Sequence, residues 1–134
     1  MENIEHIEPD DEAYAEFSQN FAAYNSANST YDWKSFSKVV KRNDKIIAGA
    51  RGIINMGALE IRGLWVDEIL RGTGMGTHLM NAIETEAQTR GATRAWLYTY
   101  SWQAEDFYKG LGYQQFARFQ YPDGPYRIDM QKEL

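Results

Sequence analysis

The sequence predicts an α/β or α+β sandwich built on a mixed sheet. Three observations predict it: short strand-like segments recur, two longer stretches have helical periodicity, and polar or glycine-containing turns separate them. The chain has 134 residues, of which 43% are hydrophobic, and it shows no internal repeat or flexible linker. A chain of this length suits one packed core, so we expect a single domain over residues 1–134.

The first half of the chain predicts one helix and three strands. Pro9-Asp10-Asp11 is typical of a helix start, because acidic residues favour the first turn. An aromatic stripe follows at spacings of three, four and three: Tyr14, Phe17, Phe21 and Tyr24. Strands are expected at 36–40, 46–54 and 58–66, with a hairpin turn at Asn43-Asp44. The apolar run Leu64-Trp65-Val66 is typical of a strand buried on both faces.

The second half predicts a long helix, a strand, a short helix and two strands. Gly91 is a natural C-terminal stop for the long helix. Five residues form the apolar face of that helix: Met75, Leu79, Met80, Ile83 and Ala87. The other expected elements are a strand at 94–100, a short helix at 103–109, and strands at 113–121 and 126–131.

Composition excludes several classes of protein. With no Cys, the chain lacks a disulfide framework, a Cys-ligated metal and a thiol nucleophile, and no other metal cluster is visible. A net charge of −5 argues against a nucleic-acid binder, which needs a basic face. No apolar run approaches the length of a membrane span, and the N-terminus lacks a signal-peptide layout. We expect a cytoplasmic protein without a membrane or nucleic-acid partner.

A glycine-rich turn stands between the third strand and the long helix. Its sequence is Arg71-Gly72-Thr73-Gly74-Met75-Gly76-Thr77, and no Asp or Glu occurs from Ile69 through Ile83. Glycine permits close approach of a ligand, and the free N–H groups of the first helical turn attract anions. The segment therefore predicts a pyrophosphate site.

The spacing of the glycines excludes two common kinds of phosphate-binding loop. The G-x-G-x-G spacing differs from the dinucleotide fingerprint, and no Gly-Lys-Ser/Thr follows, which excludes a P-loop. A tight turn that merely requires glycine is the alternative.

The motif Arg71–Gly76 resembles the R/Q-x-x-G-x-G/A motif of the GNAT superfamily of acetyl-CoA-dependent N-acetyltransferases. A second stretch is similar to that family's A-x-x-F-Y-x-x-x-G-F/Y motif: Ala104, Phe107-Tyr108-Lys109-Gly110-Leu111-Gly112-Tyr113. Together the two motifs extend the resemblance from about Leu59 to the C-terminus. The resemblance implies a mostly antiparallel central sheet flanked by helices, with two splayed strands around the acetyl-CoA arm, and one N-acetyltransferase domain over 1–134.

The resemblance also implies how acetyl-CoA is held. Backbone groups of Leu64, Trp65 and Val66 would pair with the pantetheine arm, and one N–H would polarise the thioester carbonyl. The pyrophosphate would lie on seven residues: Arg71, Gly72, Thr73, Gly74, Met75, Gly76 and Thr77. Gln103 stands where many relatives carry an Asn that contacts the pantetheine amide, a departure that leaves this contact open.

Two residues are candidates for catalysis by the same resemblance. Tyr108 matches the tyrosine that protonates the departing CoA thiolate, and its alternative role is aromatic packing beside Phe107. Glu60 matches a strand position where some relatives place a general base, and its alternative role is a surface ion pair.

The resemblance implies that the acceptor is a primary amine. Direct attack on the thioester is expected, because the chain has no Cys and no nucleophile motif. The acceptor's identity stays open between a small amine, a polyamine, an aminoglycoside-like compound and a peptide amine. The runner-up function is a non-catalytic acyl-CoA-binding or regulatory module of the same fold. A homodimer is compatible with the resemblance.

Overall fold

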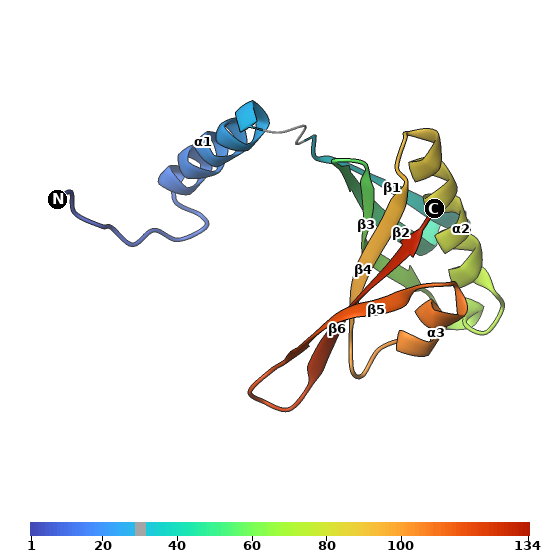
Figure 1. Cartoon of the computed structure of the whole chain (residues 1–134). Coiled ribbons are helices and arrows are strands. Elements are labelled where there is room, and N and C mark those ends of the chain that lie inside the picture. The colour runs from blue at the N-terminus through green and yellow to red at the C-terminus, as the bar shows by residue number, and fades with distance from the viewer. Residues whose placement is uncertain (29–31) are drawn as a thin grey trace. The chain divides into compact units, whose positions relative to one another are not determined.

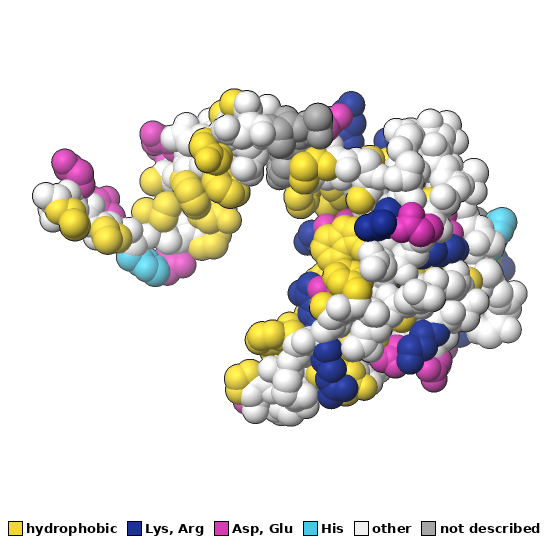
Figure 2. All heavy atoms as spheres, in the orientation of Figure 1, with side chains coloured by type: hydrophobic (Ala, Val, Ile, Leu, Met, Phe, Trp, Pro, Cys, Tyr) yellow, Lys and Arg dark blue, Asp and Glu magenta, His cyan; other side chains and the backbone are white. Residues whose placement is uncertain are grey.

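The computed structural model describes residues 1–28 and 32–134, which form two compact units, Met1–Asp32 and Trp33–Leu134. The first unit contains one helix, α1 (Glu12–Asn28), which begins directly behind Pro9-Asp10-Asp11 as the sequence predicts (Figure 1). No residue of α1 is buried, and the four aromatic side chains of its stripe are 43% to 65% exposed. Figure 2 shows hydrophobic side chains gathered along this helix.

The second unit is built on a six-stranded sheet with the order β1-β2-β3-β4-β6-β5. Every neighbouring pair is antiparallel except β3 and β4, which are parallel. The mixed, mostly antiparallel sheet expected from the resemblance is therefore confirmed. Its strands are β1 (Lys34–Arg42), β2 (Lys45–Asn55), β3 (Ala58–Val66), β4 (Arg94–Tyr100), β5 (Gln114–Gln120) and β6 (Tyr126–Glu133).

Helix α2 (Met75–Thr89) packs against one face of this sheet, and the short helix α3 (Glu105–Gly110) follows β4 (Figure 1). The core lies between α2 and the sheet. It contains Leu79, Met80 and Ile83 from the predicted apolar face of α2, packed with Leu59 and Leu97 of the strands. A 3-10 helix, η1 (Glu68–Leu70), was not predicted.

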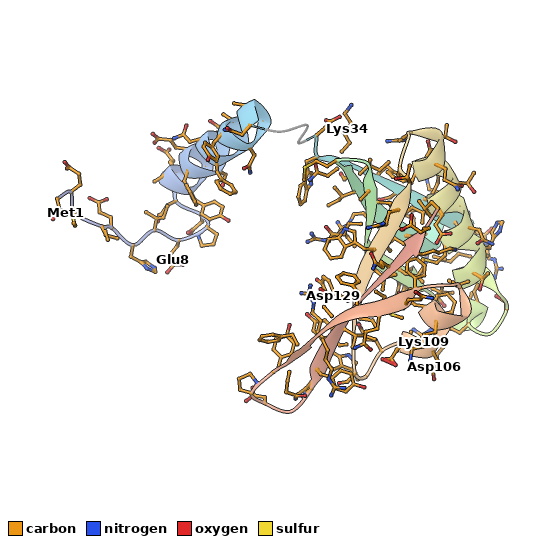
Figure 3. All side chains as sticks on the ribbon, in the orientation of Figure 1. Met1, Glu8, Lys34, Asp106, Lys109 and Asp129 are labelled. Carbon is orange, nitrogen blue, oxygen red and sulfur yellow. The ribbon has the colours of Figure 1, made fainter. Side chains whose placement is uncertain are left out.

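The opposite face of the sheet, which we call the distal face, is defined by Trp65, Tyr98, Tyr100, Arg127 and Asp129. The inward side chains of β4, Ala95, Leu97 and Thr99, are buried, so the alternating residues of that strand lie on the distal face. Figure 3 shows Asp129 on the side of the sheet turned away from α2.

One expectation about β3 is wrong. Leu64 and Val66 pack against the core, but Trp65 between them is 49% exposed. This part of the strand is therefore buried on one face only. A register shift between Arg51 and Gly52 of β2 leaves Arg62 of β3 without an opposite residue, which is a β-bulge just before this segment.

The parallel strands β3 and β4 separate along their length. They pair only through Ala58 with Arg94, Leu59 with Ala95, and Glu60 with Trp96. Beyond Glu60, the β3 edge that faces β4 no longer pairs with it, which produces the gap between splayed strands that the resemblance implies. No helix among the described residues has the length and hydropathy needed to cross a membrane.

Candidate active site

A cavity of about 1260 Å³ occupies the gap between β3 and β4. Its walls are residues 61–66 of β3 and 97–100 of β4, and residues of the glycine-rich turn and of α3 complete the lining. The cavity thus collects backbone from two separated strands, the N-terminus of a helix and the aromatic residues of a second motif. It brings together most of the residues singled out in the sequence.

The glycine-rich turn presents the N-terminus of α2 to this cavity. Gly72 and Gly74 have φ angles of +74° and +87°, in the left-handed region that favours glycine. Gly74 caps α2 without a side-chain hydrogen bond, and the first turn of the helix holds no acidic residue. The first helical bond runs from the N–H of His78 to the carbonyl of Gly74, so the N–H groups of residues 75–77 point out of the helix end. An anion would be bound well there.

The turn residues contribute in different ways. Six of the seven predicted pyrophosphate residues line the cavity: Arg71, Gly72, Gly74, Met75, Gly76 and Thr77. Thr73 does not, and its hydroxyl donates to the carbonyl of Leu70, which braces the turn. Arg71 Nε donates to the carbonyl of Val66 at 3.2 Å, which ties the guanidinium to the end of β3. A Cβ at Gly76 would lie 3.2 Å from Phe107, so glycine lets α2 and α3 approach closely.

Tyr108 lines the cavity from α3 and is half-buried. Its ring makes edge contacts with Phe107, at a centroid distance of 5.2 Å, and with Tyr113, at 6.2 Å. Burial raises the pKa of the Tyr108 phenol above its ordinary value. The hydroxyl therefore stays protonated at neutral pH, as a proton donor must.

A buried polar network lies next to Tyr108, around its neighbour Tyr113. The Tyr113 hydroxyl donates to Glu84 of α2 at 2.6 Å, and Lys132 of β6 donates to the same carboxylate at 2.8 Å. Burial and the hydrogen bond to Glu84 raise the pKa of Tyr113. The Tyr113 N–H also donates to the Tyr108 carbonyl at 3.0 Å. The network thus joins α2, whose N-terminus lines the cavity, to the end of α3, which carries Tyr108.

Gln103 also lines the cavity, but its amide oxygen is already used. It accepts the Tyr100 N–H at 2.9 Å and the Thr99 hydroxyl at 3.3 Å, which shapes the loop between β4 and α3. The side-chain NH₂ group is the part of Gln103 that a pantetheine carbonyl could accept from.

Glu60 lies on β3 outside the set of residues that line the cavity. Its carboxylate forms an ion pair with Arg62 at 3.1 Å, and its side chain is 13% exposed. Arg62 itself lines the cavity. The structure therefore links Glu60 to the site through Arg62, and the role of Glu60 as a base stays a prediction.

Several cavity residues were not predicted as ligand-binding residues: Arg62, Tyr98, Tyr100, Trp102 and Phe107. Tyr98, Tyr100 and Trp102 follow a period of two at the carboxyl end of β4, where the strand leaves its parallel neighbour. The sequence shows this alternating aromatic run, which could have indicated a lined site. The separation of the two strands could be expected only from the family resemblance.

The comparisons with known proteins agree with this geometry. The model of the acetyltransferase (GNAT) family matches residues 1–113. A crystal structure of an acetyltransferase from Bacillus cereus is 31% identical, with a TM-score of 0.82 over 97% of this chain and 98% of the other. A candidate acetyltransferase of Agrobacterium tumefaciens is 24% identical, with a TM-score of 0.89 over 100% of both chains.

A third structure is an aminoglycoside 6'-N-acetyltransferase in complex with coenzyme A. It is 18% identical, with a TM-score of 0.67 over 92% of this chain and 81% of that one, and it shares the fold. Among the curated proteins, none matches this chain. The chain belongs to the GNAT family of acetyltransferases.

Proposed function

We propose that this acetyltransferase moves the acetyl group of acetyl-CoA to a primary amine by direct attack. The observation that carries the proposal is the single cavity that joins the N-terminus of α2 to Tyr108 through the gap between β3 and β4. The end of the cavity at α2 suits a pyrophosphate, and the gap between the strands suits an extended pantetheine arm. The side at Tyr108 suits the departing sulfur. The acetyl-CoA molecule offers these groups in that order.

The residues present fit acetyl-CoA as a substrate. The outward N–H groups of Met75, Gly76 and Thr77 and the Arg71 guanidinium would hold the pyrophosphate. Beyond its last pairing with β4, β3 offers the backbone of Leu64, Trp65 and Val66 to the amide groups of the arm, as in strand addition. One of these N–H groups would stabilise the oxyanion that develops on the thioester carbonyl.

The reaction then needs two proton transfers. A neutral amine nitrogen attacks the carbonyl carbon, the C–N bond forms, and the C–S bond breaks as the tetrahedral intermediate collapses. The Tyr108 phenol gives its proton to the thiolate, and the nitrogen loses a proton to a base. Glu60 is our candidate for that base, acting through water, because Arg62 connects it to the cavity.

We also propose that the two units form one N-acetyltransferase domain. The family model runs from residue 1 to residue 113 and therefore crosses the boundary between Asp32 and Trp33. This supports the single domain expected from the sequence.

Gly74→Val tests the anion site, with Gly91→Val as a matched control. Both glycines have a positive φ and open space around a new Cβ, and they lie at opposite ends of α2. Each substitution strains the backbone by roughly 1–2 kcal/mol, but only Gly74→Val places a branched side chain at the cavity. Titration calorimetry should show acetyl-CoA affinity at least about tenfold weaker in Gly74→Val and near wild type in Gly91→Val.

The same preparations separate an enzyme from a binding module. Acetyl-CoA should bind, and thiol release should accelerate when primary amines are added. Equal acetyl-CoA affinity in folded Gly74→Val and in wild type would contradict the pyrophosphate site. Tight binding with no thiol release on any amine would favour the non-catalytic module.

A further inference from the structure

Two tryptophans stand at the mouth of the cavity on opposite walls. Trp65 comes from β3 and Trp102 from the loop that follows β4, and both line the cavity. They are 49% and 66% exposed, respectively. Indoles this exposed contribute little to the core, so their ring faces are available to stack on a ligand.

Both indoles belong to the distal face. Leu64 and Val66 pack against the core on the α2 side, so strand alternation directs Trp65 away from it. Trp102 stacks on Tyr100, whose neighbour Thr99 is buried on the α2 side. The parallel pairing of β3 with β4 ends at Glu60 with Trp96, so both indoles lie beyond the last paired residues, where the strands have separated. Both side chains therefore line the cavity from the distal side, one from β3 and one from the loop after β4.

The Trp102 indole is held in place before any ligand binds. Its ring lies 4.7 Å from that of Tyr100, with 6° between the planes. Tyr100 in turn hydrogen-bonds the Tyr121 side chain and makes an edge contact with Tyr98 at 5.7 Å. A ring that is already ordered loses little entropy when a ligand stacks on it.

Charge at the mouth limits which ligand suits it. The described residues that line the cavity include Arg62 and Arg71 and no Asp or Glu. Two carboxylates of the distal face are paired with arginines, Glu60 with Arg62 at 3.1 Å and Asp129 with Arg127 at 2.7 Å. The described residues that line the cavity therefore offer no carboxylate to a second positive charge on the acceptor.

We infer that Trp65 and Trp102 form the acceptor subsite and that the acceptor is a primary amine carrying a planar aromatic group. The aromatic group stacks between the indoles while the amine reaches toward the gap between the strands. This inference rests on the proposed acetyl transfer and names its substrate class. It excludes aliphatic polyamines as preferred acceptors.

The test compares three acceptors at saturating acetyl-CoA: 2-phenylethylamine, hexylamine and spermidine. We expect kcat/KM for 2-phenylethylamine to exceed the other two by at least about tenfold. Trp102→Leu should abolish that preference by raising KM for 2-phenylethylamine about tenfold, with hexylamine and the KM for acetyl-CoA unchanged. Trp65→Leu is the second variant and should reduce the same preference.

Trp33→Leu is the matched control, because Trp33 is 50% exposed and lies outside the cavity lining. It should behave as wild type. Equal kcat/KM for phenylethylamine and hexylamine would overturn the aromatic class. A higher KM for acetyl-CoA in Trp102→Leu, with amine preference intact, would assign the indole to the cofactor instead.

A binding measurement separates this inference from the proposed reaction. Calorimetry of the protein saturated with CoA should show 2-phenylethylamine binding that Trp102→Leu weakens about tenfold. Selective binding without any thiol release would support the subsite and refute acetyl transfer to these amines. Thiol release without selective binding would refute the subsite alone.

Discussion

The two faces of the sheet in residues 33–134 are built under different constraints. Toward α2, Leu59, Met80 and Ile83 are fully buried, and the buried carboxylate of Glu84 is hydrogen-bonded by Tyr113 and Lys132. The distal face instead exposes aromatic rings and carries the ion pair of Arg127 with Asp129. The difference teaches that packing dictates one face and leaves the other free to be shaped for a ligand.

The largest effect that would test this contrast is on stability. Ile83→Ala should lower the free energy of unfolding by about 2–5 kcal/mol, because it leaves a cavity in the core of the α2 side. Val40 of β1 packs against the core, so strand alternation puts its neighbour Val39 on the distal face. Val39→Ala removes methyl groups from a side chain that is 48% exposed and should stay within about 0.5 kcal/mol. Urea denaturation measures both. Similar losses in the two variants would show that the distal face is packed as tightly as the core.

The next effect is on catalysis at the α2 side of the cavity. Tyr108→Phe keeps the ring contacts with Phe107 and Tyr113 and removes only the hydroxyl. If the phenol protonates the thiolate, kcat should fall by about 10²-fold with little change in the KM for acetyl-CoA. Steady-state thiol release measures both constants.

The pH profile sharpens the same test. Burial raises the pKa of Tyr108 above its ordinary value. The wild-type phenol therefore keeps its proton through neutral pH and loses it only at alkaline pH. Tyr126→Phe, in β6 of the same unit and outside the cavity lining, is the control and should turn over normally. Wild-type kcat in Tyr108→Phe would assign the proton to water or to Tyr98 or Tyr100, and an unfolded Tyr108→Phe would leave only a packing role.

A smaller effect is expected from the network behind Tyr108. Tyr113→Phe leaves Glu84 buried with Lys132 as its remaining partner and should destabilise the fold by about 1–3 kcal/mol. The folded chain holds the Tyr113 proton more tightly than the unfolded chain, since the pKa is raised above its ordinary 10.0. This contribution is complete below about pH 10 and is lost as the pH rises further.

Thermal unfolding as a function of pH checks that sign. Wild type should lose stability more steeply than Tyr113→Phe above about pH 10. Parallel curves for the two proteins would mean that another group dominates alkaline unfolding.

The smallest expected effect concerns the carboxylate nearest the cavity on β3. Glu60→Gln should lower turnover about tenfold at pH values below the acceptor's own pKa. Activity should recover partly as the pH rises, because free amine then accumulates without a base. A pH–rate profile that coincides with that of wild type would reduce Glu60 to the ion-pair partner of Arg62.

The parts of the fold that local chemistry determines could be predicted from the sequence. The left-handed residues Asn43 and Asp44 form the hairpin turn, and α2 begins at Met75 behind a glycine that tolerates a positive φ. The turn and the two motifs needed only short segments, so the uncapped start of α2 and the position of Tyr108 on the short helix followed from them.

Features that depend on distant strands could not be predicted in the same way. Leu64-Trp65-Val66 has no alternation, so the exposure of Trp65 became visible only when the core on the α2 side was known. The bulge at Arg62 depends on the register of β2, and the use of the Gln103 oxygen depends on the backbone of the preceding loop. Such contacts are set by tertiary structure and leave no local signal.

The bare N-terminus of α2 has a kinetic consequence. The pyrophosphate that it would hold is common to acetyl-CoA and to free CoA, and lies at the end of the molecule remote from the acetyl group. Anchoring there cannot distinguish substrate from product. Free CoA should therefore compete with acetyl-CoA for the same turn, and the rate of acetylation should follow the ratio of the acylated to the free cofactor rather than the concentration of either alone.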